Sequence, residues 1–208
     1  MNDQKTMWNQ KHAAGVHAQL EDRPREFAVQ VADDIKPGMK LLELGCGVGS
    51  DSAYFASLGV DVVATDFSDV VIAQNKAKHA NVTFEVVDIA KPLPYEAKMF
   101  DVVYAHLSLH YYDEPKTAKV FKEIERVLRP GGMLYFSCKS VDDPLFGDGT
   151  EIQPGVFERE GHIRHFFSLD YTKQLLSKDY RVLKLEAAEG VYDGFRSAFI
   201  QCWARKEQ

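Results

Sequence analysis

Leu41-Leu42-Glu43-Leu44-Gly45-Cys46-Gly47-Val48-Gly49-Ser50 is the stretch on which the fold of this chain depends. Residues 41–44 predict a short buried strand, and the three alternate glycines after it leave the backbone without side chains, so that it can pass close to a ligand. Ser50 is a favourable helix N-cap, and apolar residues then recur at Tyr54, Phe55 and Leu58. The stretch predicts a strand, a ligand-binding turn and a helix, although such turns also occur without a ligand.

A second strand favours the ligand-binding interpretation. Residues 59–66 are mostly apolar and end in Asp66, 23 positions after Glu43. In βαβ nucleotide-binding units, an acidic residue about 20 positions on accepts hydrogen bonds from ribose hydroxyls. The glycines do not follow the G-x-G-x-x-G spacing of dinucleotide sites, and Asp51 places a carboxylate at the helix start, where it disfavours a pyrophosphate. The expected ligand is therefore a nucleoside without phosphates.

Composition argues against several classes of protein. The chain has 208 residues, 45% of them hydrophobic, which is typical of one globular domain with appendages. The net charge of -6 and the absence of a Lys/Arg cluster predict no nucleic-acid partner. No apolar run approaches the ~18 residues of a membrane span, and the N-terminus has no apolar signal core, so we expect no membrane partner and a cytoplasmic location. The three cysteines are far apart, which predicts neither a disulfide framework nor a metal site.

The glycine-rich stretch, residues 43–49, resembles the first motif of class I S-adenosylmethionine-dependent methyltransferases. The resemblance is best over residues 37–140 and continues in order through Asp66, Asp88, residues 100–106 and residues 128–132. It implies an α/β fold of the Rossmann-like, doubly wound type, with a seven-stranded sheet that is mostly parallel and has its last strand antiparallel. It also implies an enzyme that transfers a methyl group from S-adenosylmethionine to an O, N or S atom of a small-molecule substrate, leaving S-adenosylhomocysteine.

The same resemblance implies where the cofactor binds. Asp88, at the end of the third predicted strand, and Ile89 would meet the adenine, although Asp88 also suits a cap of the turn that follows. Phe67 would pack against the adenine ring, and the backbone at His106 and Leu107 would hold the methionine moiety. The predicted cofactor-binding residues are Glu43, Gly45, Cys46, Gly47, Gly49, Asp66, Phe67, Ser68, Asp88, Ile89, His106 and Leu107.

The run from His106 to Tyr112 follows the fourth predicted strand, on the side where open α/β sheets bind their ligands. Histidine suits a general base near neutral pH, although a lone histidine is more often structural. We predict His110 as the first candidate for the catalytic base and His106 as the second. The Asn/Asp-Pro-Pro-Tyr/Phe motif, which related families use on nucleobases or glutamine, is absent, and this disfavours such acceptors.

Residues 139–166 interrupt the alternation of strands and helices with acids, glycines and prolines. We expect a loop that covers the substrate, because loops of this length in compact domains are usually functional or disordered. Arg164 between two histidines is suited to hold an anionic group, unless the segment is a strand whose alternate residues face solvent. Trp8 either packs on the flank of the domain or belongs to a lid over the pocket. The predicted substrate-binding residues are Trp8, Tyr111, His162, Arg164 and His165.

The predicted organisation is a single methyltransferase domain, monomeric or homodimeric. Its segments are an N-terminal lid and helix (1–36), the cofactor-binding core (37–138), a substrate-covering insertion (139–167) and a closing helix with strands (168–208). Three alternatives stay open at this point. A regulatory or partner module that only binds S-adenosylmethionine would have its pocket plugged by residues 139–166. A methyltransferase acting on RNA or protein is the second, and a nicotinamide-dependent oxidoreductase, disfavoured by the glycine spacing, is the third.

Overall fold

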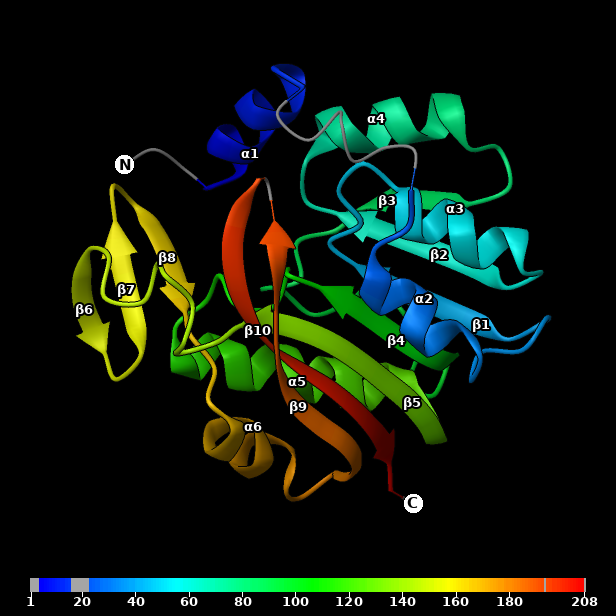
Figure 1. Cartoon of the computed structure of the whole chain (residues 1–208). Helices are drawn as coiled ribbons and strands as arrows, with labels where there is room; N and C mark the ends of the chain where they lie inside the picture. Colours follow the sequence, from blue (N-terminus) through cyan, green and yellow to red (C-terminus); the bar gives the residue numbers. More distant parts are fainter. Residues whose placement is uncertain (1–3, 16–22, 193, 208) are drawn as a thin grey trace.

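A seven-stranded sheet forms the centre of the molecule in the computed structural model, which describes residues 4–15, 23–192 and 194–207 (Figure 1). The strand order is β3-β2-β1-β4-β5-β10-β9. Strands β1 to β5 pair in parallel, whereas β10 runs antiparallel to both of its neighbours. The predicted Rossmann-like sheet with an antiparallel last strand is thus confirmed. The strands are β1 (Lys40–Leu44), β2 (Asp61–Asp66), β3 (Thr83–Val86), β4 (Phe100–His106), β5 (Leu128–Lys139), β9 (Tyr180–Tyr192) and β10 (Phe195–Lys206).

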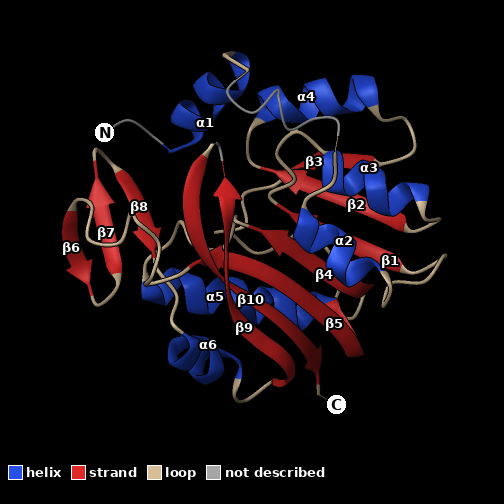
Figure 2. Ribbon diagram, in the orientation of Figure 1, coloured by secondary structure: helices blue, strands red, loops and turns tan. Residues whose placement is uncertain are grey.

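Helices pack on both faces of this sheet (Figure 2). Side chains alternate between the two faces along each strand, so that Leu41 and Tyr104 join one hydrophobic cluster and Leu42 and Ala105 join the other. The first cluster includes side chains of α2, α3 and α4, and the second includes side chains of α5 and α6. The helices are α1 (Gln4–Ala13), α2 (Glu26–Ala32), α3 (Ser50–Ser57), α4 (Asp69–Lys78), α5 (Glu114–Val127) and α6 (Leu169–Leu176). Among the described residues, no helix has the length and apolar character needed to cross a membrane.

One local expectation at the helices needs correction. Ser50 is the first residue of α3 rather than its N-cap, because Gly49 occupies the cap position in the left-handed conformation, with φ of 81°. Helix α1 has a mostly polar sequence. One of its contacts with α4 is polar, since Asn9 donates to a carboxylate oxygen of Asp69 at 2.8 Å.

Residues 139–166 hold a second, three-stranded antiparallel sheet rather than the expected loop. Its strands are β6 (Thr150–Gln153), β7 (Val156–Arg159) and β8 (His162–His165). Three phenylalanines, Phe146, Phe157 and Phe166, pack edge to face beneath it with ring centroids 5.1 to 5.8 Å apart. The backbone N–H of His165 donates to the carbonyl of His110 at 2.8 Å. This small sheet is therefore attached to the loop that follows β4.

Candidate active site

The glycine-rich turn after β1 is tied to the end of β2. The N–H groups of Gly45 and Cys46 both donate to the carbonyl of Thr65, each at 2.8 Å. Gly45 has φ of +78°, and a Cβ atom there would lie 2.3 Å from the Cβ of Ser108. A side chain would therefore clash with the segment that follows β4, and glycine allows the two segments to approach each other.

Asp66, the last residue of β2, faces this turn. Its carboxylate accepts from the N–H of Gly47 at 3.1 Å and from the N–H of Ser68 at 2.9 Å. Burial raises the pKa of Asp66, and the surrounding N–H groups oppose that rise because they stabilise the ionised form. The carboxylate is thus fixed beside the glycine turn, on the wall of a cavity.

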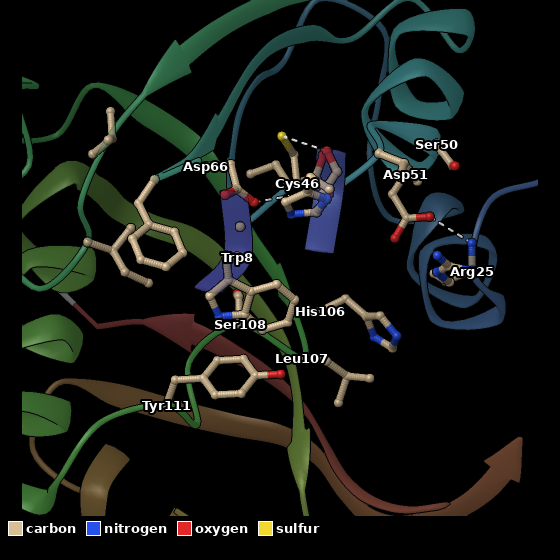
Figure 3. Close-up of a pocket in the computed structure, with 18 of the residues that line it drawn as sticks. Trp8, Arg25, Cys46, Ser50, Asp51, Asp66, His106, Leu107, Ser108 and Tyr111 are labelled. Carbon is tan, nitrogen blue, oxygen red and sulfur yellow. Dashed lines mark hydrogen bonds between the residues drawn. The ribbon is translucent and has the colours of Figure 1, made fainter. Parts of the chain in front are cut away.

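This cavity opens between the glycine turn, the ends of β2, β3 and β4, and helix α1 (Figure 3). Its empty volume is about 990 Å³ with the open mouth included. Most of the predicted cofactor-binding residues lie together on its wall: Glu43, Gly45, Cys46, Gly47, Asp66, Phe67, Ile89, His106 and Leu107.

Three predicted cofactor-binding residues lie off this wall. Gly49 and Ser68 are the N-caps of α3 and α4. The carboxylate of Asp88 accepts from the N–H of Ala90 at 3.0 Å and forms an ion pair with Lys91 at 3.3 Å. Asp88 borders a neighbouring open groove, so its contacts in this structure are those of the turn-capping alternative.

Buried carboxylates give the cavity its charge. Glu43 accepts a hydrogen bond from the hydroxyl of Ser52. Asp51 accepts from the hydroxyl of Tyr104 at 2.8 Å and from the N–H of Arg25 at 2.7 Å. Burial, and next the neighbouring Asp51, raise the pKa of Glu43 well above its ordinary value, and burial raises the pKa of Asp51. A cationic ligand would favour the ionised forms of these acids and would reduce their mutual repulsion.

Several wall residues have no signal in the sequence. Arg25 comes directly before α2, outside any motif, yet it lines the cavity close to Asp51 (Figure 3). Tyr192 also lines it without any motif, whereas Ser108 and Tyr112 on the wall belong to the predicted run from His106 to Tyr112. Leu107 has φ of 54°, in the left-handed region that residues other than glycine rarely adopt, and such strain is concentrated at functional sites.

Helix α1 covers the cavity, as the lid alternative for Trp8 predicts. The Trp8 ring lies edge to face with Tyr111 at 5.5 Å and stacks on His12 at 5.8 Å, and all three residues line the cavity. The hydroxyl of Ser68 donates to the side-chain oxygen of Asn9 at 2.7 Å. The cover is thus anchored to the start of α4, next to Asp66.

The two predicted catalytic histidines differ in their access to the cavity. His106 lines it and stacks on Phe27 at 5.9 Å, and burial, followed by the charge of Arg25, lowers the pKa of His106 to about 3. His110 is 1% exposed and is not on the wall. Burial and nearby cations lower the pKa of His110 well below its ordinary value. Both rings are therefore neutral near pH 7, and His106 is the one that borders the cavity.

The remaining predicted substrate-binding residues come from β8 and are not on the cavity wall. The His162 ring packs on Tyr111 at 5.1 Å, whereas the His165 ring packs on Phe167 and Tyr171 at 4.9 and 4.6 Å. Arg164 shares the strand face of His162, two positions away. His162 therefore packs against two rings that line the cavity, those of Tyr111 and Trp8, and His165 belongs to the packing of the main core.

Comparison with known proteins supports the resemblance seen in the sequence. Residues 42–136 match the family model of the methyltransferase domain. This segment is thus similar to the domain that class I S-adenosylmethionine-dependent methyltransferases contain. The chain is 33% identical over 129 residues to an uncharacterized methyltransferase of Synechocystis sp., covering 61% of this chain and 59% of the relative. It is 32% identical over 196 residues to phosphoethanolamine N-methyltransferase 1 of Zea mays, covering 85% of this chain and 38% of the relative.

A solved structure extends the likeness in fold to nearly the whole chain. Burkholderia thailandensis 1,6-didemethyltoxoflavin-N1-methyltransferase, solved with 1,6-didemethyltoxoflavin and S-adenosylhomocysteine, matches with a TM-score of 0.75 and 19% identity over 98% of this chain and 87% of that one. At this identity the match shows a common fold. The chain spans less than two thirds of the length of the two curated relatives.

The residues of the cavity fit S-adenosylmethionine, the cofactor of this family. Gly47 has φ of +50° and lines the cavity, and no atom lies within 4 Å of the place where its Cβ would be. The backbone is thus open to a ligand at this point. The carboxylates of Glu43 and Asp51 complement the sulfonium and ammonium groups of the cofactor, and Arg25 complements its carboxylate. The carboxylate of Asp66 suits the ribose hydroxyls, from which it can accept hydrogen bonds.

Proposed function

We propose that this chain catalyses transfer of a methyl group from S-adenosylmethionine to an O, N or S atom of a small-molecule acceptor. The observation that carries the proposal is a single cavity in which the glycine turn and Asp66 face the aromatic cover of Trp8 and Tyr111. The cofactor supplies a methyl group already activated on sulfonium. The protein then has to align the two molecules and exclude water, and such positioning contributes about 7 to 11 kcal/mol in well-oriented reactions.

The roles we assign divide the cavity into two halves. In the cofactor half, the backbone of Gly45 and Gly47 and the carboxylate of Asp66 hold the aminoacyl and ribose parts, while Phe67 and Ile89 flank the adenine. In the acceptor half, Trp8 and Tyr111 form an aromatic wall, and α1 shields the reacting atoms from water. Acceptors that carry a proton need a base between these halves.

Binding of the cofactor tests this proposal directly. We expect S-adenosylmethionine and S-adenosylhomocysteine to bind with micromolar affinity in titration calorimetry, and NADH not to bind. Asp66→Ala removes the acceptor for the ribose hydroxyls and should weaken both adenosyl ligands at least about tenfold. Asp61→Ala, at the exposed start of the same strand, is the matched control and should bind as the wild type does. Binding of NADH alone, or equal losses in the two variants, would contradict the assignment.

For an acceptor that loses a proton, we propose His106 as the general base because it is neutral and borders the cavity. With a panel of small acceptors, His106→Asn should lower kcat for S-adenosylhomocysteine formation about a hundredfold. This loss is at the low end of the rate contributions of general bases, because a base with a low pKa is a weak one. Cofactor affinity should stay unchanged. The loss of kcat in His110→Asn serves as the comparison. Circular dichroism verifies that each variant is folded. A larger loss in His110→Asn than in His106→Asn would instead assign the base to His110.

One observation favours an enzyme over a module that only binds the cofactor. The module would have its pocket plugged by residues 139–166, yet no residue of that segment lies on the cavity wall. We therefore propose a catalytic role with a small molecule as partner, rather than RNA, protein or a membrane. The cytoplasmic location and the monomeric or homodimeric state stay predictions from the sequence.

A further inference from the structure

Two buried histidine nitrogens on either side of Tyr111 have no partner. The Nδ1 atoms of His110 and His162 make no hydrogen bond within the part of the chain that the structure describes. Their side chains belong to residues that are 1% and 9% exposed, and their rings lie 4.3 and 5.1 Å from the Tyr111 ring. Buried polar groups are nearly always satisfied, so these two nitrogens point to a missing ligand.

A guanidinium without a carboxylate lies next to them. Arg164 is half-buried, and among the described residues no carboxylate lies within ion-pair distance of it. By contrast, Arg159 of the same small sheet pairs with Asp148 at 2.6 Å. Arg164 lies two positions after His162 on β8, so the two side chains share one face of this strand. A partly buried arginine is usually paired.

The other charged groups around these histidines do not supply the missing anion. Lys139 also lies near His110, and its ammonium is taken by Asp143 at 2.8 Å. Lys11 lies near His162 and over the Trp8 ring, 4.6 Å from its centroid. Arg164 is therefore the cation on which an anion site at these histidines rests, whereas the cofactor side of the cavity holds the buried carboxylates.

We propose that the methyl acceptor is an anion, a carboxylate or a phosphate monoester, whose charged group is held by Arg164 and His162. The planar guanidinium presents two parallel N–H donors to such a group, and a neutral imidazole protonated on Nδ1 supplies a third donor. The uncharged part of the acceptor lies against Tyr111 and Trp8 and reaches the cofactor. This inference rests on the proposed function and assigns the substrate class of the same site.

Simple aromatic probes test the charge preference. Benzoate, phenyl phosphate and the neutral benzamide are titrated by calorimetry into wild type saturated with S-adenosylhomocysteine. At least one of the two anions should bind about tenfold or more tightly than benzamide, and the two anionic probes distinguish a carboxylate from a phosphate acceptor. Arg164→Gln should weaken the preferred anion roughly tenfold to a hundredfold. Arg164→Lys should retain part of the affinity because the charge remains without the planar donor pair.

The controls separate this site from general charge and from the proposed function. Arg159→Gln removes the same charge from the same small sheet and should leave anion binding unchanged, and His162→Asn gives a second variant should Arg164→Gln fail to fold. Equal binding of benzamide and the anions, no binding of any probe at millimolar concentration, or an equal loss in Arg159→Gln overturns the acceptor assignment. Failure of the wild type to bind S-adenosylhomocysteine would instead overturn the proposed function.

Discussion

Replacement of Gly45 by alanine is expected to lower the free energy of unfolding by about 3 kcal/mol and to abolish measurable cofactor binding. The backbone term arises because φ is +78°, a left-handed conformation that costs other residues about 1 to 2 kcal/mol. The steric term arises because the new Cβ would lie 2.3 Å from the Cβ of Ser108. The hydroxyl of Ser108 donates to the carbonyl of Leu44, so the neighbouring segment cannot move away freely. Urea denaturation and calorimetry with S-adenosylhomocysteine measure the two effects.

A second glycine separates the two contributions. Gly131 has φ of +75° and no atom within 4 Å of its would-be Cβ, so Gly131→Ala carries the backbone cost without the clash. Adding Ser108→Gly to Gly45→Ala removes the contacted side chain and should restore part of the stability. Equal losses in the two alanine variants, or no recovery with Ser108→Gly, would show that close packing of the turn is unimportant.

The cofactor half of the site was predictable because its signals are local. The glycines at 45, 47 and 49 mark where the backbone turns and has no side chains. Asp66 is the last residue of an apolar run, so the sequence predicts its position at the carboxyl end of strand β2. The strand from Phe100 to His106 was predicted with its observed bounds. In each case a few consecutive residues carry both the secondary structure and the position of the functional group.

The acceptor half depends on contacts between distant segments. Helix α1 is held by the contacts of Asn9 with α4, which a search for apolar periodicity cannot detect. His106 and His110 belong to one run, but the left-handed turn at Leu107 separates them, so that only His106 borders the cavity. Strand β8 is attached to the loop after β4 by the hydrogen bond from the N–H of His165 to the carbonyl of His110. Arg25 reaches the cavity through the packing of α2, which no motif records.

Asp143→Ala is expected to destabilise the protein by about 3 to 5 kcal/mol because it leaves a buried ammonium without its partner. The Lys139 and Asp143 side chains are 8% and 1% exposed and lie 2.8 Å apart. The Asp143 carboxylate also accepts from the N–H of Ala198 at 2.9 Å, and Lys139 donates to the hydroxyl of Ser197 at 2.7 Å. The pair therefore joins the end of β5 to β10. Strand β10 in turn pairs with β9, whose last residue, Tyr192, lies on the cavity wall.

Urea denaturation of two further variants separates the charge effect from general loss of contacts. Glu189→Ala removes an exposed ion pair with Arg196, on the same β9–β10 hairpin, and should change stability little because exposed pairs contribute little. Adding Lys139→Met to Asp143→Ala removes the uncompensated charge and should recover much of the loss. Without that recovery, the packing of Asp143, rather than its charge, would hold the hairpin in place. With it, the charge of Asp143 holds the hairpin by neutralising Lys139. The same pairing keeps Lys139 from serving as the partner of an anion, a task that is then left to Arg164.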